Sequence, residues 1–137
     1  MKRKKIPRAG FIPYYKEDDK VYVLLMRPTD SKYGGNEFQL AKGKIDAGED
    51  SETAAFREAH EELGLKKSNV ISHSYLGLFL GYTDVYYGEI KDKNDFDPTT
   101  FETEETKWMT VDKFLSVGRG IHKPIFKAFI RAIGEEK

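Results

Sequence analysis

The chain has 137 residues, of which 39% are hydrophobic and 34% are charged, and this predicts a single globular domain over residues 1–137. Acidic and basic residues are equal in number, so the zero net charge gives no bias towards nucleic acid or a membrane surface. The sequence has no cysteine, which excludes disulfide and thiol chemistry, and no apolar run of membrane-spanning length. We therefore expect a cytoplasmic protein.

The N-terminal segment is predicted to be a flexible basic tail over residues 1–6, followed by a β-hairpin. The run Lys2–Lys5 could bind phosphate or nucleic acid, but charge runs at a terminus are usually solvated, which makes nucleic acid an unexpected partner. Apolar, β-branched and aromatic residues over 9–15 and 21–27 flank a polar turn over 16–20. This pattern is typical of two paired strands.

Glycine-containing loops are predicted between this hairpin and the next long element. The first loop, over 29–36, could close over a substrate or simply connect. A short strand over 38–40 is expected to lead into a second loop around Gly43, and a third loop follows at 47–49. Glycine in such loops allows the backbone to approach a ligand or an ion closely.

A helix is predicted over residues 51–63. Asp50 or Ser51 can accept hydrogen bonds from the first-turn N–H groups, and Glu52 interacts favourably with the helix dipole. Gly64 is suited to the left-handed residue that ends a helix. Both helix boundaries are therefore indicated by local sequence.

Acidic residues crowd one part of this helix. The segment 46–62 contains many carboxylates and a single basic residue, Arg57. On a helical wheel Glu58, Glu61 and Glu62 fall within about 100° of arc, next to an apolar stripe. Their mutual repulsion would become attraction around a divalent cation, and oxygen ligands without cysteine suit Mg²⁺ or Mn²⁺.

The C-terminal half is predicted to complete an α/β fold with a mixed sheet. Strands on both sides of a central helix, with another long helix at the end, imply a sheet covered on two faces. The expected elements are antiparallel strands over 70–80 and 83–90, a polar loop over 91–106, a strand over 108–110, a helical turn over 111–115 and an amphipathic helix over 124–133.

The segment Gly43 to Leu65 resembles the Nudix box, G-x5-E-x7-R-E-U-x-E-E-x-G-U, where U is apolar. Every fixed position is present, and the one soft departure is Ala59, where a larger aliphatic residue is usual. The segment 104–109 is also similar to the strand after the variable loop of this family. The resemblance implies a Nudix-type α/β/α sandwich in a single domain. The fixed positions are Gly43, Glu49, Arg57, Glu58, Glu61, Glu62 and Gly64.

This resemblance implies metal-dependent hydrolysis of the pyrophosphate linkage in a nucleoside diphosphate joined to another group. By motif position Glu58, Glu61 and Glu62 would hold the metal, with the carbonyl oxygen of Gly43 or its neighbour as a further ligand. Glu58 or Glu61 is also the candidate for activating the attacking water through a bound metal. Arg57 would orient the carboxylates by pairing with Glu61 one turn along the helix.

Supporting roles and their alternatives follow from the same pattern. Glu49 is expected to pair with Arg57 across the loop. The alternative is that Glu49, Arg57 and Glu61 form a purely structural ion-pair cluster. The resemblance also makes Glu104 or Glu105 a candidate for an additional carboxylate from outside the helix.

Substrate contacts are expected at three positions outside the acidic set. Lys42 and Lys44 are candidates for contacting phosphate, although both could equally be solvated. Family members acting on dinucleoside polyphosphates tend to carry a tyrosine a short distance after the box, where ADP-ribose hydrolases tend to carry a proline. Tyr82 lies at this distance, and residues 66–97 contain no proline. Dinucleoside polyphosphates are the favoured substrate, with ADP-ribose or another nucleotide sugar as the alternative.

Tyr82 and the catalytic role each have an alternative interpretation. Tyr82 could stack on an adenine or be an ordinary hairpin aromatic residue. A non-catalytic nucleotide-binding or interaction module of this fold would be expected to show a damaged glutamate set, whereas the set here is intact. The expected partner is therefore a small-molecule nucleotide substrate, and the sequence leaves a homodimer possible.

Overall fold

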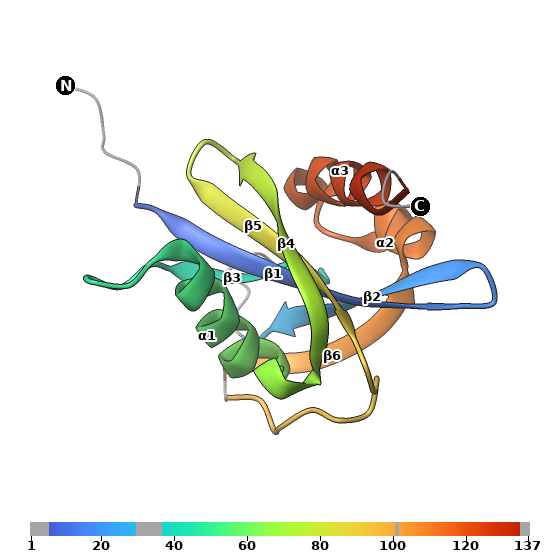
Figure 1. Cartoon of the computed structure of the whole chain (residues 1–137). Coiled ribbons are helices and arrows are strands. Elements are labelled where there is room, and N and C mark those ends of the chain that lie inside the picture. The colour runs from blue at the N-terminus through green and yellow to red at the C-terminus, as the bar shows by residue number, and fades with distance from the viewer. Residues whose placement is uncertain (1–5, 30–36, 101, 135–137) are drawn as a thin grey trace.

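The computed structural model describes residues 6–29, 37–100 and 102–134, and shows a mixed α/β domain (Figure 1). The predicted basic tail lies outside the described residues except for Ile6, as does the predicted loop 29–36 except for Thr29. The elements, with η for a 3₁₀-helix, are β1 (Arg8–Glu17), β2 (Lys20–Pro28), β3 (Ala41–Lys44), α1 (Ser51–Leu63), η2 (Lys67–Asn69), β4 (Val70–Phe79), β5 (Thr83–Ile90), β6 (Thr103–Thr110), α2 (Val111–Val117), η3 (Gly120–His122) and α3 (Lys123–Gly134).

The described strands form one mixed sheet in the order β4-β5-β1-β2-β6, with β3 paired to β1. Strand β1 runs parallel to β5 and antiparallel to β2 and β3. Along one edge of β1, residues 8–11 pair with β3, and residues 14–17 pair with β2. β2 and β3 therefore divide this edge of β1 between them.

Helices cover both faces of the sheet (Figure 1). Side chains of a strand alternate between faces, so neighbouring positions of β1 enter different cores. Phe11 packs in the cluster that contains the apolar residues of α1, whereas Ile12 packs in the cluster that contains Phe114 of α2 and Phe129 of α3. This arrangement confirms the predicted α/β/α sandwich.

The predicted central helix is confirmed, from Ser51 to Leu63. The carboxylate of Asp50 accepts the N–H of Thr53 at 2.7 Å and caps the first turn. Gly64 has a φ of 77° in the left-handed region, and its N–H reaches the last-turn carbonyl groups. The final helix is also confirmed, with small boundary shifts, as α3.

Two predictions near the acidic helix were wrong. A strand was expected over 38–40 and a loop at 42–44, but Gln39 makes only an isolated bridge with Met26, while Ala41–Lys44 forms β3. Lysine and glycine have low strand propensity, and β3 exists because β1 supplies its hydrogen-bond partners. The predicted loop over 91–106 likewise ends early, because β6 begins at Thr103 against β2.

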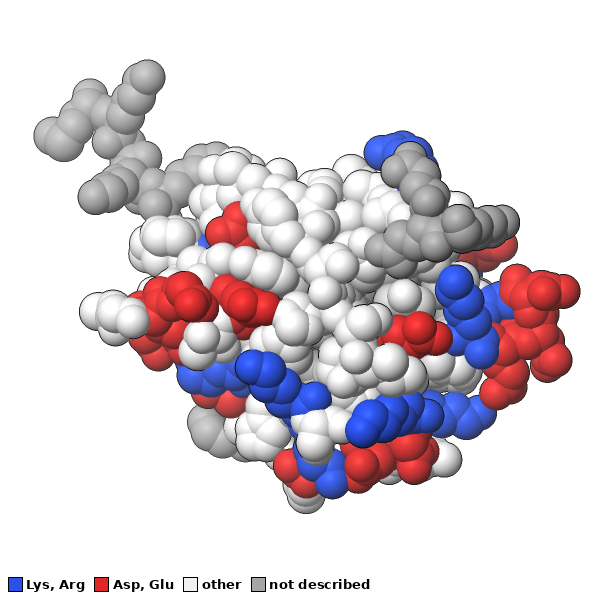
Figure 2. Space-filling model, in the orientation of Figure 1, with Lys and Arg blue, Asp and Glu red and all other residues white. Residues whose placement is uncertain are grey.

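The surface carries both signs of charge. Figure 2 shows acidic and basic side chains interspersed over the left, lower and right parts of one face, with uncharged residues in its upper middle. Within the described part of the chain, no helix is long and apolar enough to cross a membrane.

Candidate active site

A cleft of about 930 Å³ opens where β2 and β3 separate. It brings together segments distant in sequence: the start of β1, the end of β2, strand β3, the second half of α1 and the turn before β5. Its lining includes the residues singled out by sequence, namely Gly43, Glu58, Glu61, Glu62, Tyr82, Lys42 and Lys44. One concave site therefore holds the predicted metal-ligand and substrate-contact residues.

Glu58 is the least exposed of the charged α1 residues that line the cleft. It is only 9% exposed, and its carboxyl group packs directly against the backbone of Gly43. A Cβ atom at Gly43 would lie 2.2 Å from the Glu58 carboxyl carbon, so any side chain there would force one group to move. The close approach, and not the backbone conformation, requires glycine here, since the φ of Gly43 is not in the left-handed region.

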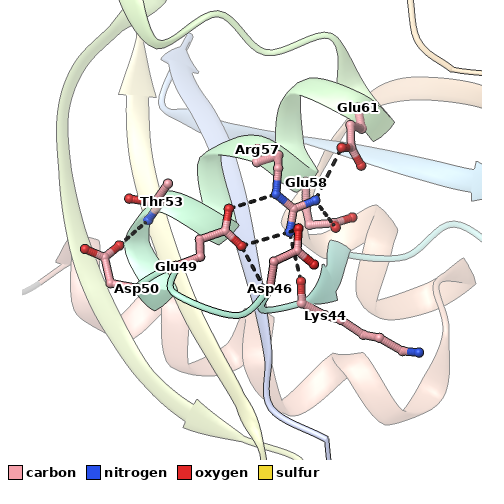
Figure 3. Close-up of polar contacts among 8 residues, drawn as sticks. All are labelled: Lys44, Asp46, Glu49, Asp50, Thr53, Arg57, Glu58 and Glu61. Atoms are coloured by element: carbon pink, nitrogen blue, oxygen red, sulfur yellow. Dashed lines mark hydrogen bonds and ion pairs between the residues drawn. The ribbon is translucent and has the colours of Figure 1, made fainter.

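Arg57 and Glu49 do not line the cleft, but Arg57 is the centre of an ion-pair network that includes Glu58 and Glu61, which do (Figure 3). Its Nε donates to Glu49 Oε2 at 2.8 Å, and its Nη1 donates to Glu58 Oε2 at 2.8 Å and Glu61 Oε1 at 3.3 Å. Its Nη2 donates to the carbonyl oxygen of Lys44 at 2.9 Å, which ties the helix to the end of β3. The pairs expected with Glu49 and Glu61 are both present.

These contacts fix the charge states of the network. Hydrogen bonds from Arg57 lower the pKa of Glu49 to about 2, and the contacts with Glu49 and Glu58 raise the pKa of Arg57 above its usual range. The backbone N–H of Asp46 also donates to Glu49, at 3.0 Å. Glu49 is therefore charged at neutral pH and holds the arginine beside the helix carboxylates.

Glu62 has a different environment. Burial and a hydrogen bond with Glu58 raise the pKa of Glu62 well above its usual range, although the backbone N–H of Lys42 opposes this by donating to its carboxylate. Two carboxyl groups in contact in a buried place cannot both ionise without a compensating cation. This pair therefore favours either a shared proton or a bound positive ion.

The donor set fits a hard divalent cation in type and position. Among the described residues no three acidic or histidine side chains are already arranged to hold a metal ion. The reason is visible in the contacts, because Arg57 engages Glu58 and Glu61 while Glu62 bonds Glu58. A cation would replace a proton shared by Glu58 and Glu62 and draw the carboxylates together. Oxygen donors are the ligands that Mg²⁺ and Mn²⁺ prefer.

The predicted supporting carboxylates occupy other places. Glu105 forms an ion pair with Arg27 at 3.2 Å across β2 and β6, and Glu104 is exposed. Neither residue lines the cleft, whereas Glu102, just before β6, does. Of these acidic residues only Glu102 lines the same cleft as the α1 carboxylates, and the path of the chain into β6 puts it there.

Two further cleft residues, Arg8 and Arg119, were not singled out from sequence. Arg8 begins β1, and Arg119 lies between α2 and η3. Neither belongs to a local motif, so no sequence signal could have found them. Their position depends on long-range pairing alone.

His122 lies behind the cleft and contacts Leu40, one of its lining residues. It is fully buried, and its Nδ1 accepts the N–H of Leu40 at 3.1 Å just before β3. Burial, with the nearby charges of Lys42 and Arg119, lowers the pKa of His122 to about 3. The imidazole is therefore neutral and packed, as a structural residue.

The structure is thus an α/β/α sandwich in which a glutamate-bearing helix packs against a mixed sheet and its carboxylates face a glycine of β3 in a cleft. The chain matches the model of the NUDIX domain over residues 4–129 and belongs to the Nudix family. With its intact glutamates it is a Nudix pyrophosphohydrolase. Nudix hydrolases generally use divalent metal ions.

Solved structures with this fold include proteins of several kinds. A binary complex of a C. elegans Ap4A hydrolase superposes with a TM-score of 0.74 at 20% identity, covering 96% of this chain and 99% of that one. The Nudix hydrolase RenU from M. smegmatis gives 0.75 at 17% identity, with coverage of 95% and 87%. The NUDIX domain of Shewanella oneidensis NrtR, complexed with ADP ribose, gives 0.74 at 13%, with coverage of 96% and 90%. At these identities the similarity establishes the fold.

Proposed function

We propose that this protein hydrolyses the pyrophosphate linkage of dinucleoside polyphosphates, with Mg²⁺ or Mn²⁺ held by Glu58, Glu61, Glu62 and the carbonyl oxygen of Gly43. The observation that carries the proposal is their convergence, together with Tyr82, on one cleft of about 930 Å³. Clefts of several hundred Å³ are the usual size for nucleotide-sized ligands.

The reaction assigns a task to each part of the site. When bound, the cation would neutralise phosphate charge and make the bound water more acidic. Glu58 or Glu61 accepts the proton of the attacking water, whose oxygen bonds to phosphorus as the anhydride P–O bond breaks and the second phosphate leaves. Arg57 holds both carboxylates in place through its 2.8 Å and 3.3 Å hydrogen bonds, and Glu49 holds Arg57.

The preference for dinucleoside polyphosphates rests on Tyr82. This half-buried side chain lines the cleft, and aromatic rings of this kind stack on nucleobases. ADP-ribose, or another nucleotide sugar, is the alternative substrate. Among proteins of this fold, the NrtR domain was solved with ADP ribose, and another structure is that of an Ap4A hydrolase.

A substrate panel tests the proposal. Diadenosine tetraphosphate, ADP-ribose and a nucleotide sugar are incubated with the full chain and Mg²⁺, Mn²⁺ or EDTA, and the products are separated by chromatography. We expect metal-dependent cleavage, fastest for the diadenosine compound. Absence of cleavage with every substrate and either metal would contradict the hydrolase assignment, and faster cleavage of ADP-ribose would contradict only the substrate.

A further inference from the structure

Four basic residues line the cleft, of which Lys44 is exposed and the other three are half-buried. Arg8, Lys42 and Arg119 all contribute to its wall. Within the described ranges, no carboxylate lies within the 4.0 Å ion-pair distance of any of them. These three half-buried cations share one concave site and have no ion-pair partner within 4.0 Å, and they form what we call the basic wall.

Strand geometry separates the basic wall from the glutamates. Gly43 faces the carboxyl group of Glu58, so the alternation of side chains along β3 directs Lys42 to the opposite face of the sheet. Lys42 lies directly opposite Gly10 of β1, and Arg8 of β1 occupies the same face two residues earlier. One short strand thus presents glycine to the acidic side and lysine to the basic side.

Arg119 is held in place from a different part of the chain. Its backbone N–H donates to the carbonyl oxygen of Phe38 at 2.9 Å, and its Nη1 donates to Gln39 Oε1 at 2.9 Å. Gln39, which accepts this bond, is itself only 5% exposed. A guanidinium has five N–H donors, and the bond to Gln39 uses one of them while orienting the group.

The three cations of the basic wall line one concave site, so their like charges repel one another in the absence of a ligand. A multiply charged anion would relieve this repulsion and supply acceptors for the guanidinium groups.

We propose that Arg8, Lys42 and Arg119 form a subsite for a phosphate group that is not cleaved. This phosphate lies further along the polyphosphate chain of the substrate than the reacting linkage. This inference rests on the proposed function and makes Arg8 and Arg119 specificity-determining residues. A substrate bridged by three or more phosphates can place phosphate at the glutamates and at the basic wall together. ADP-ribose has two phosphates, both belonging to the reacting linkage, and leaves the subsite empty.

The kinetic test compares two substrates in matched variants. Arg8→Gln and Arg119→Gln each remove one charge from the basic wall, while Arg131→Gln removes the same charge from the exposed side of α3, outside the cleft. We expect each wall variant to raise KM for diadenosine tetraphosphate about tenfold, the usual scale for a charge-assisted hydrogen bond, with little change in kcat. KM for ADP-ribose should change less than about twofold, and Arg8→Lys should restore part of the loss.

An equal loss on both substrates, or no loss on either, would overturn the subsite. Binding of inorganic tripolyphosphate, measured by calorimetry at fixed Mg²⁺, separates this outcome from failure of the proposed function because it requires no catalysis. Weaker binding in both wall variants, and unchanged binding in Arg131→Gln, would support the subsite even if no nucleotide were cleaved. Unchanged binding in all variants would refute it. If Arg119→Gln fails to fold, Arg8→Gln provides the test. The side chain of Arg8 makes no hydrogen bond or ion pair with the residues that the structure describes.

Discussion

A Cβ atom on Gly43 would lie 2.2 Å from the carboxyl carbon of Glu58, well inside van der Waals contact. We predict that Gly43→Ala displaces Glu58 and lowers kcat by about 10²-fold, because an error near 1 Å in a catalytic group has effects of that order. Overpacking should also cost about 1–3 kcal/mol of unfolding free energy. The control is Gly134→Ala, where an added Cβ meets nothing within 4 Å. Normal kcat in Gly43→Ala would show that Glu58 need not stay where it is.

Glu62→Gln should lower turnover by roughly two to three orders of magnitude, a size typical for loss of one charge-stabilising group in an active site. Its fold should be intact, because the amide is a neutral mimic of the buried carboxyl group whose pKa is already raised. Steady-state kinetics with Mg²⁺ and the melting temperature without metal measure the two effects.

The control for this variant is Glu52→Gln, which makes the same chemical change on the same helix at a side chain that pairs with His73 outside the cleft. Near-normal activity of Glu62→Gln would remove Glu62 from the ligand set. A large loss in Glu52→Gln would instead show that the helix tolerates no loss of charge.

Divalent metal should raise thermal stability. A ligand that binds only the folded state at ten times its Kd adds about 1.4 kcal/mol, which corresponds to about 5 °C in Tm for a chain of this length. Binding would also relieve the crowding of Glu58, Glu61 and Glu62. Calorimetric scans with millimolar Mg²⁺ or Mn²⁺ measure the shift, which should shrink in Glu62→Gln. A Tm unaffected by either ion would count against a preformed metal site.

Diadenosine polyphosphates should be cleaved with a higher kcat/KM than ADP-ribose, and Tyr82→Ala should raise KM more than it lowers kcat. Loss of base stacking costs about 1–3 kcal/mol, which is roughly 5- to 150-fold in KM. Tyr75→Ala is the control, since Tyr75 is 52% exposed on β4 and bonds Asp84 at 2.7 Å, away from the cleft. A change in kcat alone would argue against a binding role for Tyr82.

His122 predicts a pH dependence of stability. Its pKa is about 3 in the folded protein and near 6.5 when unfolded, so the unfolded state binds more protons between these values. The contribution of His122 is complete above pH 6.5 and is lost as the pH falls towards 3. Between pH 6.5 and 5 this amounts to about 2 kcal/mol of unfolding free energy.

The measurement is denaturant unfolding of the wild type and of His122→Asn, whose side-chain oxygen can still accept the N–H of Leu40. We expect the difference in unfolding free energy between the two proteins to change by that amount over this pH range. The comparison is needed because Glu62, with its raised pKa, contributes a slope of opposite sign that is common to both proteins. A difference independent of pH would show that His122 is not buried in its neutral form.

The acidic helix was predictable because its determinants are local. Asp50 and Gly64 cap it from adjacent positions, and the pairing of Arg57 with Glu61 follows from one helical turn. Strand β3 was not predictable in the same way. Residues 41–44 look like a loop until β1, more than thirty positions earlier in the sequence, offers a partner for their backbone.

Spacing within a few helical turns was enough to identify the family, the helix and the carboxylates that share one side of it. Tertiary packing was needed to bring Arg8 and Arg119 into the same cleft as Lys42, to line that cleft with Glu102 rather than Glu104 or Glu105, and to bury Glu62 against Glu58. The physical reason is that burial and charge proximity arise where distant segments pack together. Local periodicity does not indicate which distant strand or loop will pack against a given segment.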